Sequence, residues 1–383
     1  MKSSLLLSSL ATIGGLMLAG IGASAAADTT SSKDPAARDY REYLLTVTRP
    51  NQLQVIDMAS NSLLRSCDIP GPFGSGIMVP ATDGKTAYVI TNIWEDVVGI
   101  DIRNCEITFH AAQSSGNETV KSFQSVAVSQ DGQELYTVQN PVRLMSDHYE
   151  VLEPRLAVFE IADGVGAQPV RTFPVDRRIT KIAATGTGEV ILGGGDLQAI
   201  NPETGEIRLL EPLQNWDRGE QWMTPDAFAM HTQGSQANEY IMPYSTARFT
   251  DDEQDMATAE WWWGISRVDL ETAESERMEI APLTEVIMNF VTDPTDDNTL
   301  YGVFNSVSKI DISAKTIVKE QPLDHTYYTV NVSRDGNTVY AGGTSSDISV
   351  HDAETLEQIA SIQLPGDMST SDMRVAIIHD TAP

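Results

Sequence analysis

The chain has 383 residues and a formal net charge of −29, from 25 Lys and Arg against 54 Asp and Glu. This charge argues against nucleic acid or an anionic membrane surface as a partner, because both would repel the protein. The length is ample for a large core and fits either several domains or one closed body built from repeats.

The first 27 residues have the pattern of a cleavable signal peptide. Lys2 precedes an apolar run, Leu5–Ile21, and the small residues Ala23–Ala27 offer cleavage positions. Residues 28–40 are small and polar, which predicts a flexible leader. No other apolar run approaches 18 residues, so no membrane span is expected. We therefore expect an exported, soluble, periplasmic protein.

Two cysteines follow the predicted signal peptide, Cys67 and Cys105. An oxidising compartment favours a disulfide between them, and the alternative is a pair of buried free thiols. No Cys-x-x-Cys-His motif occurs, so this chain is not expected to carry a covalent c-type haem.

Short runs with a period of two residues recur along the chain, separated by polar turns. The predicted units, in chain order, are 43–69, 76–111, 125–159, 179–210, 226–279, 287–319 and 327–364. The last unit contains four predicted strands within about 38 residues. They are Thr329–Ser333, Val339–Gly342, Ile348–His351 and Gln358–Leu364. Four strands at this spacing are typical of one blade of a β-propeller.

The pattern as a whole predicts an all-β fold, a seven-bladed β-propeller of four-stranded antiparallel blades over residues 41–380. The first unit lacks one strand, and the alternating segment Met373–Ile378 has no blade of its own. We expect this C-terminal segment to supply the innermost strand of blade one and to close the ring, which removes open sheet edges.

Loop lengths differ between the two faces of the predicted ring. Short hairpins mark one face: Asp83-Gly84, Asp131-Gly132, Asp335-Gly336, Glu203-Thr204, Glu271-Thr272 and Glu354-Thr355. The other face receives two insertions between strands two and three, Gln139–Arg155 and Pro243–Trp263, and two linkers, Gln214–Pro225 and Leu323–Tyr328. Long loops gathered on one face usually mark a functional or docking surface.

Several constellations on this loop face have more than one interpretation. Trp261–Trp263 could contact a partner or belong to the core and rim of blade five. The acidic segment Asp251–Asp255 with Glu260 lacks EF-hand spacing, so a solvated loop is favoured and no metal is expected. His325 could line a cavity beside aromatic residues or be a structural histidine. Hydrolytic, zinc-protease and phosphate-loop motifs are not found in the sequence.

Several loop segments resemble the β subunit of quinohaemoprotein amine dehydrogenase. They are Pro141–Leu144 with Asp147–Val151, Tyr244–Arg248, Pro322–Ser333, and Asp352–Glu357 continuing to Leu364–Gly366. The resemblance extends from about Arg41 to His379, and the loop segments are its most specific part.

This resemblance implies a periplasmic complex that oxidatively deaminates primary amines. Its dihaem α subunit carries two c-type haems and passes electrons to a periplasmic acceptor, and its γ subunit carries cysteine tryptophylquinone. The β subunit carries no cofactor or catalytic residue and helps to wall the active-site cavity. The candidate cavity or γ-subunit contacts here are Arg143, His148, Tyr149, Tyr244, His325, Tyr327 and Tyr328. The acidic, Trp-rich insertion at 250–263 has no counterpart that we recognise in the family.

Two other functions remain open from the sequence. One is a stand-alone exported propeller of the YVTN-repeat kind that binds a protein or glycan, which would have short loops on both faces. The other is a lactonase-type hydrolase with a metal in the axial channel. That hydrolase needs several carboxylates or histidines at the channel entrance, and the linkers offer Asp226, Asp324 and His325.

Overall fold

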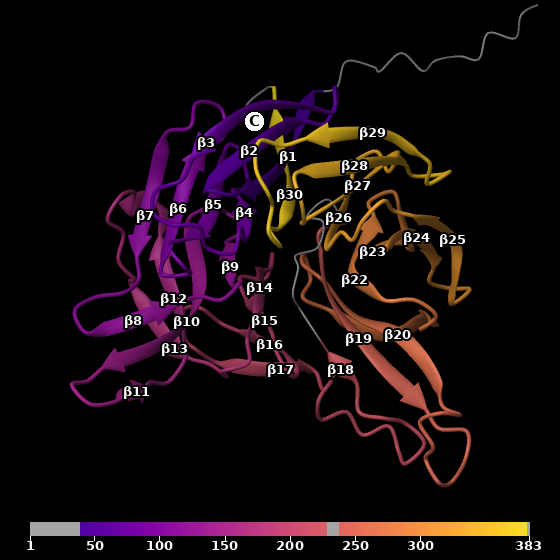
Figure 1. Ribbon diagram of the computed structural model, residues 1–383. Helices are drawn as coiled ribbons and strands as arrows, with labels where there is room; N and C mark the ends of the chain where they lie inside the picture. The colour runs from indigo at the N-terminus through magenta and orange to yellow at the C-terminus, as the bar shows by residue number, and fades with distance from the viewer. Residues whose placement is uncertain (1–38, 228–236, 381–383) are drawn as a thin grey trace, which may run out of the picture. The chain divides into compact units, whose positions relative to one another are not determined.

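The computed structural model describes residues 39–227 and 237–380, so the predicted signal peptide lies outside the described residues. The described chain forms seven antiparallel sheets, six with four strands and one with six, arranged as the blades of a ring (Figure 1). The helical residues in this part are in 3₁₀ conformation, as in the turn Ile161–Asp163. Among the described residues, no helix has the length and apolar character needed to cross a membrane.

The blades follow the chain order that the sequence predicts. From the ring axis outward, blade one contains β30 (Met373–His379), β1 (Tyr40–Thr48), β2 (Gln52–Asp57) and β3 (Ser62–Asp68). Blade two contains β4 (Met78–Pro80), β5 (Thr86–Thr91), β6 (Asp96–Asp101) and β7 (Ile107–Ala112). Blade three contains β9 (Val126–Val128), β10 (Glu134–Leu144), β12 (Arg155–Glu160) and β13 (Arg171–Pro174). Blade four contains β14 (Lys181–Ala184), β15 (Val190–Gly193), β16 (Leu197–Ile200) and β17 (Ile207–Glu211); blade five β18 (Asp226–Ala227), β19 (Glu239–Arg248), β20 (Glu260–Asp269) and β21 (Ser275–Pro282). Blade six contains β22 (Ile287–Asp293), β23 (Asp296–Phe304), β24 (Ser306–Asp311) and β25 (Thr316–Pro322); blade seven β26 (Thr329–Val332), β27 (Thr338–Gly342), β28 (Asp347–Asp352) and β29 (Gln358–Gln363).

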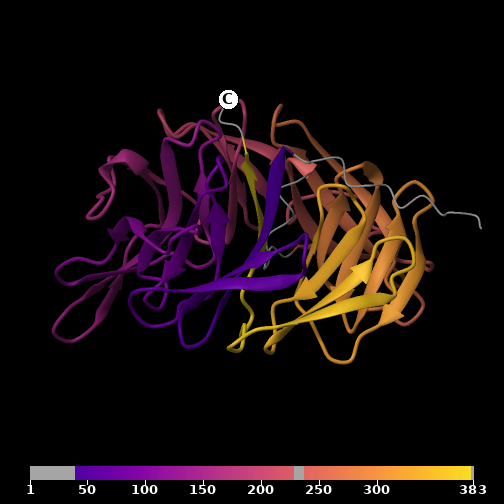
Figure 2. The same ribbon diagram turned by 90° about the horizontal axis from the view of Figure 1, so that it is seen from above.

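The ring closes as the sequence predicts, through its two chain ends. β30 pairs antiparallel with β1 over seven residue pairs, from Tyr40–His379 to Thr46–Met373. Figure 2 shows the yellow C-terminal strand running beside the indigo N-terminal strand. The pairing supplies the strand that blade one lacks, so β1 is not left as an open sheet edge.

The hydrophobic core consists of seven clusters, one at each interface between neighbouring blades of the described chain. Between blades one and two, for example, Leu45 and Val55 pack with Met78 and Val89. Inner strands are buried on both faces and therefore show continuous burial, as in β26. Outer strands such as β29 face solvent and are mostly exposed. Each blade is thus stabilised mainly by burial against its two neighbours.

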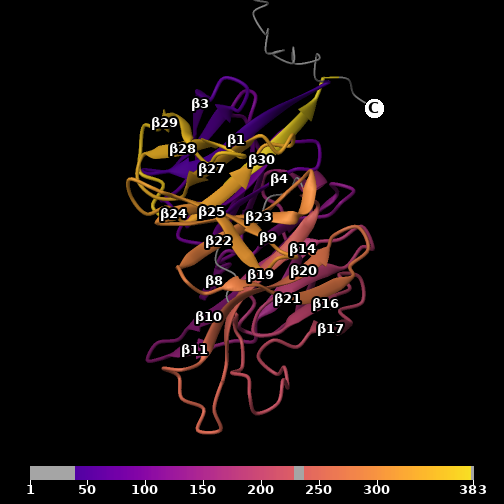
Figure 3. The same ribbon diagram turned by 90° about the vertical axis from the view of Figure 1, so that its right-hand side faces the viewer.

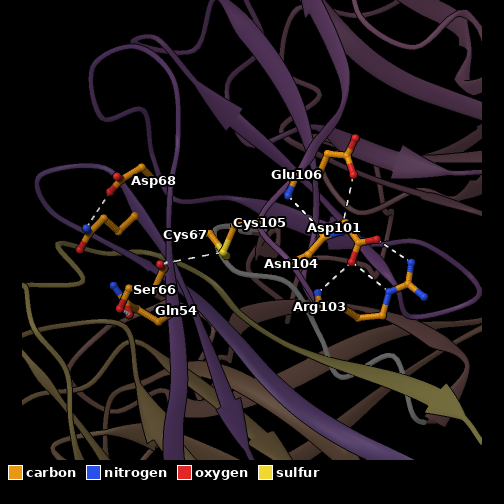
Figure 4. Close-up of a disulfide and its surroundings, with 10 residues drawn as sticks. Gln54, Ser66, Cys67, Asp68, Asp101, Arg103, Asn104, Cys105 and Glu106 are labelled. Carbon is orange, nitrogen blue, oxygen red and sulfur yellow. Dashed lines mark hydrogen bonds and ion pairs between the residues drawn. A yellow bond between two sulfur atoms is a disulfide. The ribbon is translucent and has the colours of Figure 1, made fainter.

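A disulfide joins blades one and two, which confirms the pairing predicted from the sequence. Cys67 lies in β3, Cys105 lies in the turn between β6 and β7, and their Cα atoms are 5.2 Å apart (Figure 4). The turn around Cys105 is stabilised by Asp101, which forms a 2.6 Å ion pair with Arg103. The covalent link therefore joins the outer parts of two adjacent blades.

The predicted insertion at 139–155 differs from a plain loop. β10 continues past its blade, and its outer half pairs with β8 (Glu118–Lys121) on one side and β11 (Tyr149–Val151) on the other. We call this three-stranded extension, residues 118–121 and 140–151, the arm. It forms because Val142-Arg143-Leu144 and Tyr149-Glu150-Val151 both alternate with a period of two residues, which permits a hairpin register.

Removal of the disulfide tests its contribution to stability. Because it closes a loop of 38 residues, the double variant Cys67→Ala/Cys105→Ala should lose about 4 kcal/mol of unfolding free energy. Urea unfolding of the variant and of the reduced and oxidised native chain measures this loss, and reduction controls for the cavity that Cys67→Ala leaves. Equal midpoints for the reduced and oxidised chains would contradict the prediction.

Candidate functional site on the loop face

The loop face is the side of the ring formed by the strand-two-to-three connections and the linkers between blades. The residues that the sequence singles out lie in three places on it. His325, Tyr327 and Tyr328 lie in the linker between blades six and seven, Tyr244 lies in β19, and Arg143, His148 and Tyr149 lie in the arm. The arm and the β19–β20 hairpin extend beyond the blades at the lower end of Figure 3.

The linker between blades six and seven brings His325 and Tyr327 onto one carboxylate. His325 Nε2 lies 3.0 Å from Asp347 Oδ1, and the Tyr327 hydroxyl donates a 2.5 Å hydrogen bond to Asp347 Oδ2. The two rings pack at 4.2 Å between centroids. Tyr327 is 2% exposed, whereas 36% of the His325 side chain is accessible. Asp347 therefore orients an imidazole that still faces solvent.

Asp347 was not singled out from the sequence, although a signal was present. Asp347 is the first residue of β28, the third strand of blade seven. Third strands begin at the loop face, so Asp347 lies beside the linker between blades six and seven. His325 Nδ1 lies 3.2 Å from the Thr326 carbonyl oxygen, so both ring nitrogens have partners within the chain, and the cluster presents an oriented imidazole ring at the face. Tyr328 packs against Phe304 with ring centroids 5.8 Å apart, which supports the linker.

Burial is the main cause of the raised pKa of Tyr327, and its hydrogen bond to Asp347 adds to the effect. Burial also raises the pKa of Tyr244, with a further contribution from the negative charge of Glu279. Both phenols are consequently hydrogen-bond donors throughout the neutral pH range.

Tyr244 lies below the surface. Its side chain is fully buried and opposite Gly264, where a Cβ atom would come within 2.1 Å of the Tyr244 ring. The Tyr244 hydroxyl donates to Glu279 Oε1 at 3.3 Å. Tyr244 therefore does not form part of the exposed surface, and it affects the loop face by supporting the residues that cover it.

The linker between blades four and five covers Tyr244 with an arginine–tryptophan stack. The Arg218 guanidinium lies 4.1 Å from the Trp216 ring centroid and 3.6 Å from that of Trp222, and it forms a 2.7 Å ion pair with Glu279. Arg277 stacks on Trp216 at 3.9 Å. Cation–π contacts and a largely buried ion pair thus hold this linker against blade five. The alternation of Trp and Arg within 216–222 was the available sequence signal, and it was missed.

The β19–β20 hairpin lies against the same linker. Gln254 at its tip donates to the Glu220 carbonyl at 2.7 Å, and the Phe249 amide donates to the Gln221 carbonyl at 2.8 Å. Asp251 organises the acidic tip by accepting hydrogen bonds from the Asp255 amide and the Thr258 hydroxyl, at 3.0 and 2.5 Å. Hydrogen bonding, led by the Asp255 amide, lowers the pKa of Asp251.

The three adjacent tryptophans divide between core and rim. Trp263 is 4% exposed, packs against Phe290, and donates from its indole nitrogen to the Glu285 carbonyl at 2.9 Å. Trp261 and Trp262 are half-buried. Trp263 is therefore a core residue of the interface between blades five and six.

Blade two contains a strained turn that its sequence pattern does not reveal. Asn92, Ile93 and Trp94 all have positive φ, at 51°, 53° and 70°. Each non-glycine residue in this left-handed region costs about 1–2 kcal/mol, and Ile is especially unsuited to it. Lys121 supports the turn by donating to the Ile93 carbonyl at 2.9 Å. The turn leaves Ile93 47% exposed on the loop face, and such strain is often kept where a surface is used.

Three cavities of the described chain lie away from these clusters. A groove of about 770 Å³ lies between blades three and four on the short-hairpin face, and its lining includes Glu134 and Glu189. Glu134 is paired with Arg171, and Glu189 forms a two-point contact with Arg208 at 2.7 Å. Each pair lies within one blade, the first in blade three and the second in blade four, so these charges of the groove have structural partners. Smaller cavities of about 310 and 300 Å³ lie at the inner strands and on the loop face of blade four.

Within residues 39–227 and 237–380, no group of three or more His, Cys, Asp or Glu side chains has an arrangement suited to a metal ion. The acidic tip at 251–255 is organised by internal hydrogen bonds.

Comparisons with known proteins identify the fold alone. No family model matches the chain, and no curated protein sequence matches it. Apo AztD from Citrobacter koseri is 13% identical, with a TM-score of 0.51 and coverage of 88% of this chain and 98% of AztD. A functionally unknown protein from Desulfotomaculum acetoxidans is 10% identical, with a TM-score of 0.55 and coverage of 88% and 99%. Hydrazine synthase from Kuenenia stuttgartiensis is 12% identical, with a TM-score of 0.51 and coverage of 82% and 90%.

The raised pKa of Tyr327 predicts a loss of stability at alkaline pH. In the unfolded chain a tyrosine ionises near pH 10, so above that pH the folded chain retains a proton that the unfolded chain releases. The free energy of unfolding should then fall by up to about 1.4 kcal/mol per pH unit from this group. Urea unfolding between pH 8 and about 12 should show a shallower decline for Tyr327→Phe than for the native chain.

Tyr149→Phe is the matched control for this experiment, because the Tyr149 side chain is 75% exposed. It should leave the alkaline profile unchanged. Parallel profiles for the native chain and Tyr327→Phe would contradict the assignment of a buried, Asp347-bonded phenol.

Replacement of Arg218 tests the stack. Arg218→Leu removes both aromatic contacts and leaves Glu279 without the Arg218 guanidinium as its ion-pair partner. We therefore expect the free energy of unfolding to fall by roughly 2–4 kcal/mol. Protease cleavage between residues 214 and 225 should become at least about tenfold faster. Arg218→Lys keeps the charge but loses the planar stacking. Its stability and its cleavage rate should lie between those of the native chain and those of Arg218→Leu. Cleavage at native rates in Arg218→Leu would show that the stack does not hold the linker.

Proposed function

We propose that this chain is the β subunit of a periplasmic quinohaemoprotein amine dehydrogenase, a complex that oxidatively deaminates primary amines. Within it the chain carries no redox cofactor, supports the quinone-bearing γ subunit and walls the active-site cavity. The observation that carries the proposal is the loop face itself. Three of the segments that resemble the family (141–151, 244–248 and 322–333) lie on or beneath this face, whereas 352–357 forms a hairpin on the short-hairpin face.

The state of the cysteines supports a division of labour between subunits. Cys67 and Cys105 are joined to each other, so neither is available for a thioether to a haem or a tryptophan-derived quinone. The two c-type haems then belong to the α subunit and the cysteine tryptophylquinone to the γ subunit. A disulfide also fits the export that the N-terminal sequence predicts.

The residues of this chain act by shape and hydrogen bonding in the proposal. His325, oriented by Asp347 and only partly covered, presents the uncovered part of its ring to a substrate cavity or to γ. Tyr327 and Tyr328 support it, and the arm residues Arg143, His148 and Tyr149 contribute further contacts. Tyr244 acts from below by fixing Glu279 and the linker that covers it.

Purification from the native source tests the proposal directly. We expect this chain to co-purify with a larger chain and a small chain, with the visible absorption of c-type haem and activity on primary amines. A colourless protein that elutes alone would overturn the proposal and favour a stand-alone propeller that binds a protein or glycan.

Substitution of His325 tests the placement of the site. In the assembled complex, His325→Ala should reduce amine turnover by roughly 10-fold or more if the oriented ring helps to position the substrate or γ. Ile359→Ala, at an exposed residue of the outer strand β29, is the control. Unchanged turnover in His325→Ala, in complexes that assemble normally, would place the site elsewhere.

A further inference from the structure

The arm has an unusual distribution of side chains between its two faces. Because directly opposite residues in a sheet share a face, the register places Val142, Leu144, Tyr149 and Val151 together. Leu144, Tyr149 and Val151 are 45%, 75% and 62% exposed. The outer part of this face is therefore apolar and directed to solvent, whereas its inner part carries Thr119, Asn140 and Lys121.

The opposite face of the arm carries charged side chains at its outer end and a buried side chain closer to the blades. Arg143 lies opposite Glu150 and Glu118, and it is 2.9 Å from the Glu150 carboxylate. Val120, on the same face, is fully buried. A sheet that faces water on one side normally turns its polar residues outward, so this arrangement is inverted. An apolar surface kept exposed in this way marks an interaction site.

The edge of the arm shows what kind of molecule fits there. Leu152 N donates to the Pro141 carbonyl at 3.1 Å, and Met145 N donates to the His148 carbonyl at 3.0 Å. In an antiparallel pair, hydrogen-bonded and non-hydrogen-bonded positions alternate, so Tyr149 and Val151 occupy non-hydrogen-bonded positions. Their N–H and C=O groups point away from β10.

Within the described residues, β11 pairs with β10 and with no other strand. The outward groups of Tyr149 and Val151 are therefore spaced to receive an added strand. β11 contains no Lys, Pro or bulge, so its short length of three residues and the charge of Glu150 are what limit pairing at this edge. Main-chain pairing to such an edge, with side-chain contacts on alternate residues, is a common mode of peptide recognition.

The charge of this segment indicates the chemistry of the partner. Residues 144–154 contain Asp147, Glu150 and Glu153 and no Lys or Arg. A second copy of the chain would bring the same charges to the edge, on a protein with a net charge of −29. Repulsion therefore disfavours self-pairing, whereas a cationic strand is attracted.

We propose that β11 is a docking edge for an extended segment of a different protein in which apolar residues alternate with Lys or Arg. The segment pairs with the outward amide and carbonyl groups of Tyr149 and Val151, and its apolar side chains cover Tyr149, Val151 and Leu144. This inference does not depend on the amine dehydrogenase proposal, because it follows from the register, exposure and charge of the arm.

The test uses the full mature chain and a small set of eight-residue peptides in which Val, Leu or Tyr alternates with Lys. Fluorescence anisotropy should detect binding of at least one peptide at concentrations up to about 1 mM. Peptides with Glu in place of Lys should bind at least about tenfold more weakly. On binding, the amide hydrogens of Tyr149 and Val151 should exchange more slowly with solvent deuterium.

Val151→Pro supplies the decisive variant. It removes an outward N–H but no hydrogen bond to β10, so the arm should keep its fold. Binding should weaken by about tenfold or more, the equivalent of one lost hydrogen bond with its contacts. Val151→Thr keeps the N–H group and is the matched control, with a loss of about threefold or less.

Three results would overturn the proposal. They are the failure of every Lys peptide to bind, binding that Val151→Pro leaves unchanged, and unaltered deuterium exchange at Tyr149 and Val151 in the bound native chain. Concentration-dependent dimerisation that Val151→Pro abolishes would also overturn it, because the occupant would then be a second copy. None of these results bears on whether the native protein carries haem-bearing and quinone-bearing partners.

Discussion

The antiparallel pairing of β1 with β30 is the interaction on which the ring depends. It joins residues more than 300 positions apart in the sequence, from Tyr40–His379 to Thr46–Met373. Without it, blade one would lack its innermost strand and β1 would expose a row of unpaired amide and carbonyl groups. Closure also allows every blade to have two neighbours, and the seven core clusters each lie between two such neighbours. The stability of each blade is therefore coupled to the stability of the whole ring.

In this closed ring the two faces differ in structure: one consists of short, ion-paired hairpins, and the other carries the longer connections. The face with short hairpins is tied together by ion pairs such as Arg171 with Glu134 and Arg208 with Glu189. On the other face, longer segments are added to the blades without disturbing the core, because they connect strands that are already paired. The Arg218 stack shows how such a segment becomes ordered, through contacts with two indole rings and one carboxylate.

The loop face combines ordered polar groups with exposed apolar ones. His325 is oriented by Asp347 within a supported linker, while Ile93 and the outer face of the arm stay uncovered. These features lie on different blades, so they can serve different contacts. In the function we propose, the oriented ring would serve the catalytic partner and the free apolar surface would serve an additional protein.

The sequence by itself predicted the class of fold, the chain order of the blades and the strand that closes the ring, and it favoured a disulfide between Cys67 and Cys105 over two free thiols. The outer strand of blade three, β13, lies beyond the predicted unit 125–159. The sequence could predict these features because period-two alternation and turn residues are local properties, and because two cysteines allow one intramolecular pair. It also located the long connections on one face, since strand order dictates where each loop emerges.

Only the tertiary structure decided how the side chains on that face are used. Asp347 meets His325 and Tyr327 because blade seven places the start of β28 beside a linker 20 residues away. Tyr244 proved to be buried, and the arm proved to be a sheet with its apolar side outward. These outcomes depend on register and on packing between distant segments, and a one-dimensional pattern does not specify which of two faces meets solvent.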